Sequence, residues 1–443
     1  MQRLTPIAAA FALALSGAAA ADTQDNAALR EEIRALQQRL EALEQTSAST
    51  QPAVPASATG PASGFNPSVA LVLSGTYANL SQDPQTYRLQ GFLPSGDEVG
   101  PGSRSFSLGE SELTLSANAD HWFKGTLTLA ATAENEVEVE EAKLETLALP
   151  GGSNLVAGRF LSGIGYLNAE HSHSWQFVDL PLLYQAFYGG QYKNDGVQLR
   201  WLAPTSLYLE LAAELGNGAA YPGSESSQNG AGSAAGFIRL GDDIGHDLSW
   251  QTHLWYQQSK VAQRTYTDVN SADVEVDNSF SGRSRSWGVA AVGKWRPFGD
   301  SLRQLKVQGE WLRRSESGEM QYDNAAAVSG PLSGAYDSRQ SGWYLQASYR
   351  WQRNWQASLR YDQLDSGTQH IGLVEDGKLS HDDFSMLSAY RPTRSTLAID
   401  YLPSEFSRVR LQYSRDDSQP QRIDQQWFLN YTLSLGAHGA HGF

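Results

Sequence analysis

Two pairs of histidines are the residues of this chain whose type and spacing could support chemistry. His171 and His173 stand two apart in the segment HSH, and His438 and His441 stand three apart in the closing segment GAHGAHGF. Residues two apart in an extended segment point to the same side, so His171 and His173 could bind one zinc ion together with an Asp or Glu. Hydrogen bonding within a polar loop accounts for the same pair without a metal, and the chain has no cysteine to assist as a ligand.

The acidic segments of the chain form no catalytic pattern. The carboxylates in ESELTL and EVEVEEAKLE recur at alternating positions, which a strand with one charged face explains. The G-x-S-x-G elbow, the phosphate-binding P-loop and the dinucleotide-binding fingerprint do not occur in the sequence. We therefore predict that the protein is not an enzyme and needs no cofactor.

The N-terminal segment has the layout of a secretory signal peptide. Arg3 supplies a positive start, residues 7–15 form an apolar run, and alanines at 18–20 form a cleavage context, so residues 1–21 are expected to be removed. No later window holds about 18 consecutive apolar residues, which excludes a transmembrane helix. The net charge of −15 becomes −16 when the single Arg of the signal peptide is removed, and this acidity argues against a nucleic-acid partner.

A short helical module and a linker follow. Residues 22–46 carry apolar side chains at spacings of four, three, four and three, which is the seam of a coiled coil and predicts oligomerisation in the periplasm. A single amphipathic helix lying on the body of the protein is the alternative. Residues 47–64 are rich in Pro, Ser and Ala and predict an extended linker. The seam residues are Leu29, Ile33, Leu36, Leu40 and Leu43.

From residue 65 to 443 the dominant pattern is a two-residue alternation of apolar and polar side chains. Segments such as FKGTLTLAA and WYLQASYRW each predict a strand with one apolar and one polar face. Several of these segments are about ten residues long and carry aromatic residues near their ends, as Trp343 and Trp351 do, which is typical of strands that cross a membrane. The fold class is therefore all-β: a closed, antiparallel transmembrane barrel of about sixteen strands in the outer membrane.

The connections between the strands alternate in length. Short turns such as DH at Asp120 and RN at Arg353 alternate with long connections, as periplasmic turns and outer loops do in bacterial barrels. The segment DFSMLSAYRP at 383–392 could hold an additional pair of strands. The stripe of Trp427, Leu429 and Tyr431 identifies the tail as the closing strand, so His441 would lie near the interface. The long connections are expected at 80–104, 162–194, 260–282, 316–339 and 366–393.

The segment GRFLSGIGYLNAEHSHSWQFVDLPLLYQAFYGGQYKNDGVQL resembles a strand, an inward loop and a returning strand of bacterial porins, especially the phosphate-selective porin-like group. Some porins of that type carry a periplasmic coiled coil and form trimers, which implies a homotrimer here. The resemblance also implies that the loop narrows the pore, with Gly163, Gly165, Asp179 and Asp195 as its residues. The tail YTLSLGAHGAHGF resembles uncharacterised proteobacterial outer-membrane proteins, some labelled zinc-regulated or receptor-like, and its terminal Phe443 resembles a barrel assembly signal.

The polar faces of the predicted strands define a lumen wall. Basic residues are slightly more numerous than acidic ones on this wall, which favours a weak preference for anions. A wall of salt bridges without net selectivity is the alternative. The predicted pore-lining residues are Lys124, Arg159, Arg200, Arg239, Glu210, Lys306, Arg350, Arg360, Arg408 and Arg410.

The sequence therefore predicts an outer-membrane porin for the passive diffusion of small hydrophilic solutes. Its expected partners are the outer-membrane lipid, copies of itself and the solutes. A zinc-related or other metal-related uptake protein is the first alternative, and a structural or adhesive barrel is the second. An energy-coupled receptor does not fit, because it needs a plug domain and about 22 strands.

Overall fold

The computed structural model describes residues 67–94, 99–132, 136–224, 229–297, 299–300, 302–328 and 330–436. The predicted signal peptide, coiled-coil helix and linker at 1–64 lie outside the described residues, as do His438, His441 and Phe443. Within the described ranges, no helix has the length and apolar character needed to cross a membrane.

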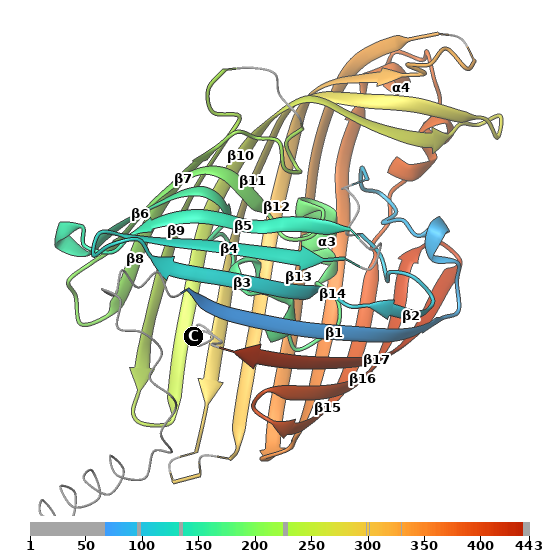
Figure 1. Ribbon diagram of the computed structural model, residues 1–443. Coiled ribbons are helices and arrows are strands. Elements are labelled where there is room, and N and C mark those ends of the chain that lie inside the picture. Colours follow the sequence, from blue (N-terminus) through green and yellow to red (C-terminus); the bar gives the residue numbers. More distant parts are fainter. Residues whose placement is uncertain are drawn as a thin grey trace, which may run out of the picture. The chain divides into compact units, whose positions relative to one another are not determined.

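The described chain is a sequence of antiparallel strands (Figure 1). The first group consists of β1 Ser68–Leu80, β2 Ser105–Leu108, β3 Ser111–Asn118, β4 Phe123–Ala131, β5 Val137–Thr146, β6 Ser153–Leu161, β7 Lys193–Leu202, β8 Tyr208–Gly216 and β9 Ser233–Ile244. The second consists of β10 Leu248–Val269, β11 Glu275–Trp295, β12 Gln304–Tyr322, β13 Leu332–Gln352, β14 Trp355–Ile371, β15 Thr393–Ser404, β16 Ser407–Gln419 and β17 Arg422–Gly436.

The strands close into one barrel. β1 pairs with β17 on one side and with both β2 and β3 on the other, so the sheet has no free edge among the described strands. β2 and β3 are two parts of one strand position, separated at Gly109, where a Cβ would lie 2.3 Å from the Oγ of Ser74. The described strands therefore fill sixteen positions, and the prediction of an antiparallel barrel of about sixteen strands is confirmed.

The wall of the barrel is much taller on one side than on the other. Strands β4 to β8 have nine or ten residues each, whereas β10 to β13 have 19 to 22. Figure 1 shows β10 to β14 rising past the short strands. We call the end joined by short turns the turn end and the opposite end the loop end.

Two of the long connections expected from the sequence are largely strand. Residues 270–274 alone join β10 to β11, and residues 323–331 join β12 to β13. Toward the loop end, β10 to β13 continue although their outward side chains become polar. This part of each strand therefore lacks the apolar stripe from which a membrane strand is predicted. Inward residues of this upper part, including Tyr266, Phe280 and Tyr336, pack in an apolar cluster instead. The segment 383–392 holds no additional strands; its first part belongs to the short helix η5 His381–Leu387.

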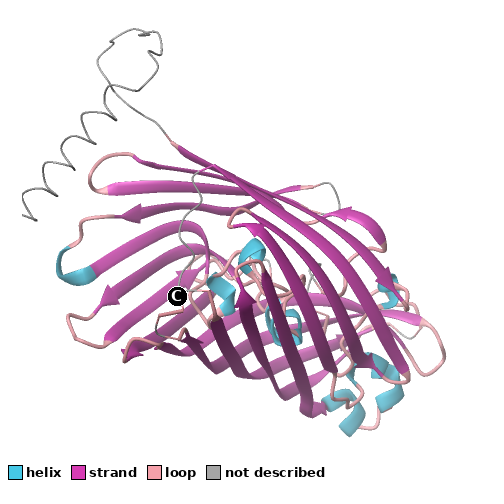
Figure 2. Ribbon diagram, turned by 90° about the horizontal axis from the view of Figure 1, so that it is seen from below, coloured by secondary structure: helices cyan, strands magenta, loops and turns pink. Residues whose placement is uncertain are grey.

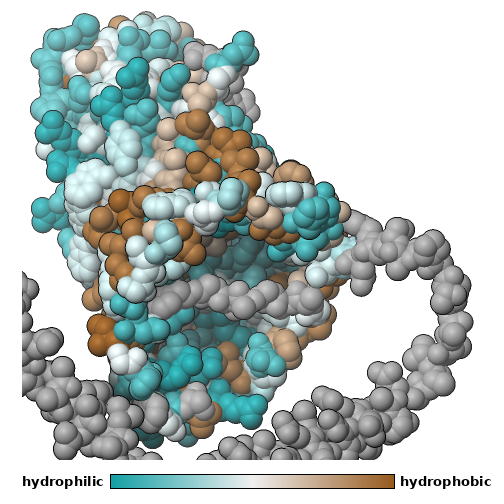
Figure 3. Space-filling view, turned by 90° about the vertical axis from the view of Figure 1, so that its left-hand side faces the viewer, coloured by the Kyte–Doolittle hydropathy of each residue, from teal (hydrophilic) through white to brown (hydrophobic). Residues whose placement is uncertain are grey.

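The outward face of the wall carries an apolar band. Leu345 and Leu359 are 53% and 60% exposed, and aromatic pairs stand at both limits of the band, with Trp355 and Tyr401 at the turn end. Trp287 and Trp311 lie toward the loop end with ring centroids 4.7 Å apart. Figure 3 shows apolar side chains gathered on the outer surface below a hydrophilic upper part. This distribution matches a surface that meets hydrocarbon in the middle and water above it.

Candidate functional site: the inward loop and its cavities

Residues 162–192, between β6 and β7, fold into the barrel instead of projecting from it. We call this segment the inward loop. It contains the short helices η3 Leu167–Ala169, η4 Ser172–Ser174 and α3 Leu182–Tyr188, and Figure 2 shows these helices inside the ring of strands. All seven residues of α3 are buried. The loop follows the fifth strand position, as the sequence predicts.

Gly165 lets the loop pass close to the wall. Its φ is +66°, and a Cβ would lie 2.4 Å from the hydroxyl of Tyr184 and 2.5 Å from a carboxylate oxygen of Glu310. A side chain at this position is therefore excluded both by the left-handed backbone and by space. Gly163 is similarly crowded, because a Cβ would lie 2.3 Å from the ring of Phe237.

The inner wall is not uniformly polar, contrary to the expectation from the alternating pattern. Strands β9 to β14 direct apolar side chains inward, and these pack against α3 and its neighbours in one buried cluster. The loop therefore fills the barrel on the side of β9 to β14, and the lumen is narrower than a sixteen-strand barrel alone would leave. The wall residues of this cluster are Phe237, Trp255, Ala290, Val292, Leu312, Tyr344 and Leu364.

Buried carboxylates of the wall accept hydrogen bonds from the backbone of the loop. Glu214 on β8 accepts from the backbone N–H of Gly163 at 3.0 Å. Glu310 on β12 accepts from the N–H of Leu167 at 3.1 Å and from the hydroxyl of Tyr184 at 2.9 Å. These bonds satisfy backbone groups that would otherwise be buried without partners.

Asp179 joins the inward loop to β14, β15 and β16. Its Oδ2 lies 2.9 Å from a guanidinium nitrogen of Arg360 and 2.7 Å from one of Arg394, and its Oδ1 accepts from Gln412 at 2.7 Å. Burial by itself would raise the pKa of Asp179, but the two guanidinium groups outweigh it and hold the pKa below its usual range. The ion pairs therefore stabilise the loop at neutral pH, and this contribution is lost only when the pH falls through the lowered pKa.

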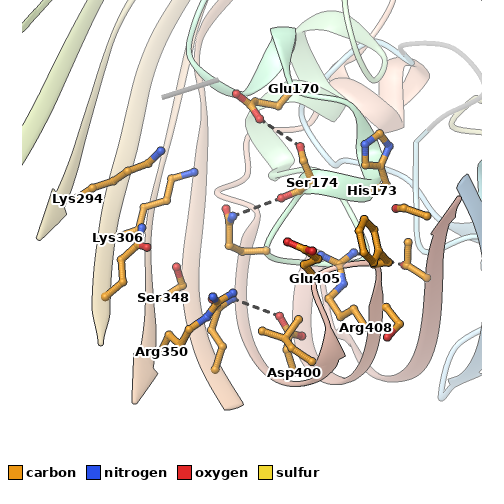
Figure 4. Close-up of a pocket in the computed structure, with 18 of the residues that line it drawn as sticks. Glu170, His173, Ser174, Lys294, Lys306, Ser348, Arg350, Asp400, Glu405 and Arg408 are labelled. Atoms are coloured by element: carbon orange, nitrogen blue, oxygen red, sulfur yellow. Dashed lines mark hydrogen bonds between the residues drawn. The ribbon is translucent and has the colours of Figure 1, made fainter. Parts of the chain in front are cut away.

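A basic cavity of about 310 Å³ lies between the loop and the turn end of the barrel. Lys294, Lys306, Arg350 and Arg408 line it from β11, β12, β13 and β16, and Figure 4 shows Lys294 and Lys306 on adjacent strands. Its carboxylates are Glu170, Asp400 and Glu405. Both oxygens of Asp400 are bonded to Arg410, at 2.7 and 2.9 Å. The cations therefore outnumber the carboxylates that are not already paired.

A second cavity, of about 230 Å³, lies beside the short wall and has balanced charges. Arg200 lies 2.6 Å from Glu145, and Lys143 lies 2.6 Å from Glu141. The third basic residue, Arg239, pairs outside this set with Glu210 at 3.4 Å. Salt bridges of this kind leave little net field in the cavity, so the excess of cations is concentrated in the basic cavity.

Two of the predicted site residues face away from the lumen. Arg159 and Asp195 form an ion pair at 2.6 Å, and their side chains are 41% and 40% exposed. Asp195 alternates in step with the outward Val197, and it belongs to β7, not to the loop. The expectation that Arg159 lines the pore and that Asp195 belongs to the constriction is thus corrected. Arg159 follows the outward Leu155 and Ala157 by regular alternation, whereas Val156 and Phe160 face inward, so the alternation of β6 itself places Arg159 on the outer face. The other predicted lining residues face inward: Lys124, Arg200, Arg239, Glu210, Lys306, Arg350, Arg360, Arg408 and Arg410.

His171 and His173 meet carboxylates of the short wall. Nδ1 of His171 lies 3.2 Å from both Glu112 and Glu140, and its Nε2 lies 3.6 Å from Glu141. Nδ1 of His173 lies 3.0 Å from Glu112. Burial would lower the pKa of His171, but hydrogen bonds to the three carboxylates outweigh it and raise the pKa well above its usual range.

Two functional residues were not predicted from the sequence. Arg394 is 1% exposed and pairs with Asp179; its position two residues before the inward Thr396 in TRSTLAID is a signal that could have found it. Glu140 has no such signal, because a β-bulge turns it inward beside Glu141 against the simple alternation.

The comparisons with known proteins agree with this architecture. No family model matches the chain. An uncharacterized protein of Aquifex aeolicus (strain VF5) is 28% identical over 409 residues, which cover 86% of this chain and 80% of that protein. OmpT of Vibrio cholerae, an outer membrane protein solved in a trimer form, has a TM-score of 0.50 at 9% identity over 84% of this chain and 99% of OmpT. A loop-deletion mutant of the same OmpT has a TM-score of 0.50 at 11% identity, with the same coverage of both chains.

The chain has the fold of outer-membrane porins. Besides the balanced salt bridges of the second cavity, the inner-wall charges of this porin fold form two further groups. One group, with Glu214, Glu310 and Arg360, holds the inward loop. The other group, with Lys306 and Arg350, faces the basic cavity.

Replacing Asp179 by Ala should release the loop. The substitution removes a buried partner of two guanidinium groups, which costs about 3 kcal/mol locally and raises the amide exchange of α3 about a hundredfold. Hydrogen–deuterium exchange read by mass spectrometry over residues 182–188 measures this. The control is Asp242→Ala at the exposed turn end of β9. Equal exchange in both variants would show that Asp179 does not hold the loop.

Proposed function

We propose that the protein is an outer-membrane channel through which small hydrophilic solutes diffuse passively, with a preference for anions. The observation that carries the proposal is the basic cavity below the inward loop. The outward apolar band with aromatic residues at its limits supports a membrane setting for the barrel. The porin fold supports a channel as the general role.

The charges at the cavity support the anion preference. No carboxylate among the described residues lies within ion-pair distance of Lys306 or Arg350, and the ammonium of Lys306 lies 4.7 Å from the ring centroid of Tyr166. Unpaired cations that face a solvent-filled cavity create a positive potential for a passing ion. The packed loop restricts the passage to small solutes.

Exchanging two of these cations for acids should reverse the preference. We expect Lys306→Glu/Arg350→Glu to shift the reversal potential toward the cation side, because the substitutions change the local charge by four units. The measurement uses purified protein in a planar bilayer under a salt gradient, with Lys260→Glu on the outward face as the control. A cation-selective native channel would refute the anion preference. An unchanged reversal potential in the double variant would show that the cations of this cavity do not set the selectivity.

We further propose that the channel is a homotrimer that associates through the short wall and the coiled coil at 22–46. The outward ion pair of Arg159 and Asp195 supports this, because a charged pair on the outer wall is costly in hydrocarbon but suits a protein interface. The trimer form of OmpT, which shares the fold, is consistent with the same arrangement.

The mass of the detergent-solubilised native protein tests this association. Light scattering coupled to size exclusion should give three chains per particle. Arg159→Glu places two acids opposite each other and should increase the monomer fraction, whereas Lys260→Glu on the tall wall should not. A native particle of one chain would contradict the proposal.

A further inference from the structure

We propose that Glu112, Glu140 and His171 form a site for a divalent transition-metal cation such as Zn²⁺, which ties the inward loop to the short wall. One ligand comes from β3, one from β5 and one from the loop. This site is separate from the basic cavity, and it does not depend on the transport of any solute.

The distances between the donor atoms suit a metal. Nδ1 of His171 lies 3.2 Å from Oε2 of Glu112 and 3.2 Å from Oε2 of Glu140. Ligand atoms that surround a tetrahedral zinc ion lie about 3.4 Å apart, given metal–ligand distances of about 2.0–2.2 Å. The ligand atoms of all three residues lie within 4.8 Å of one another. Mixed imidazole and carboxylate donors favour zinc and its neighbours over magnesium.

Burial and charge support the same assignment. Glu112 is 2% exposed and Glu140 is 0% exposed, so two carboxylates are buried side by side. Oε1 of Glu140 is buried and has no hydrogen-bond partner among the described residues. A buried acceptor without a partner is costly unless a cation binds it.

The fold constructs this site by breaking the regular alternation of β5. A register shift opposite Thr128 and Leu129 makes Glu140 the extra residue of a β-bulge, and it turns inward next to Glu141. His171 and Glu141 line the 230 Å³ cavity, so the imidazole borders open volume.

His173 orients the site without being required as a ligand. Its Nδ1 lies 3.0 Å from Oε1 of Glu112, the carboxylate oxygen that does not face His171. Its ring stacks on that of His171 with centroids 5.7 Å apart and an interplanar angle of 18°. Outer partners of this kind fix the direction of a metal-binding carboxylate.

Zinc binding to the purified full chain tests the site. After treatment with a chelator, loading with ZnCl2 and dialysis, we expect one zinc per chain by elemental mass spectrometry. Glu140→Gln and His171→Gln should each weaken the binding, measured by calorimetry, by about a hundredfold or more. Glu145→Gln, an inward residue of the same strand that pairs with Arg200, is the matched control and should bind as the native chain does.

X-ray absorption at the zinc edge of the native protein keeps the test decisive if a variant does not fold. Imidazole nitrogen and carboxylate oxygen together in the coordination shell would support the site. Native protein without zinc after dialysis, equal affinity in Glu140→Gln and Glu145→Gln, or displacement of zinc by magnesium would overturn it.

Discussion

A loop that folds inside a barrel must find partners for its backbone groups away from bulk water, and the rest of this structure depends on how the wall supplies them. Glu214, Glu310 and Asp362 accept hydrogen bonds from backbone N–H groups of the loop. Arg360 and Arg408 donate to its carbonyls, at 2.8 and 3.0 Å. Because charged groups make the stronger hydrogen bonds, a few wall residues can hold thirty residues of loop.

The same loop decides what remains of the lumen. Its apolar side chains pack against Leu312, Tyr344 and Leu364 on the tall side of the barrel. That packing fills the tall side of the barrel, and open volume is left in the basic cavity and in the cavity beside the short wall. Glu214, Glu310 and Arg360 hold the loop, whereas Lys306 and Arg350 face the basic cavity.

The outer surface shows a matching asymmetry. The tall wall carries an apolar band, the aromatic pair of Trp287 and Trp311, and then the exposed cations Arg283 and Arg285. The short wall carries the outward ion pair of Arg159 and Asp195 near its loop end.

Much of the fold was predictable from the sequence, because alternation in a membrane strand is enforced by lipid on one side. Segments such as FKGTLTLAA and WYLQASYRW kept their predicted faces, and the short turns fell where Asp120 and Arg353 indicated. The extensions of β10 to β13 were missed, because above the apolar band both faces meet polar or protein surroundings and the alternation loses its hydrophobic signal.

The sequence by itself determined the strand class, the parity of the barrel and the inward direction of most wall charges, since these follow from local periodicity. Only the tertiary structure decided which charges meet. Asp179 finds Arg394 across more than 200 residues of chain, and Glu140 reaches His171 through a bulge that periodicity does not encode. Such contacts depend on the closure of the barrel and on the path of one loop across it, and neither is a property of any short segment.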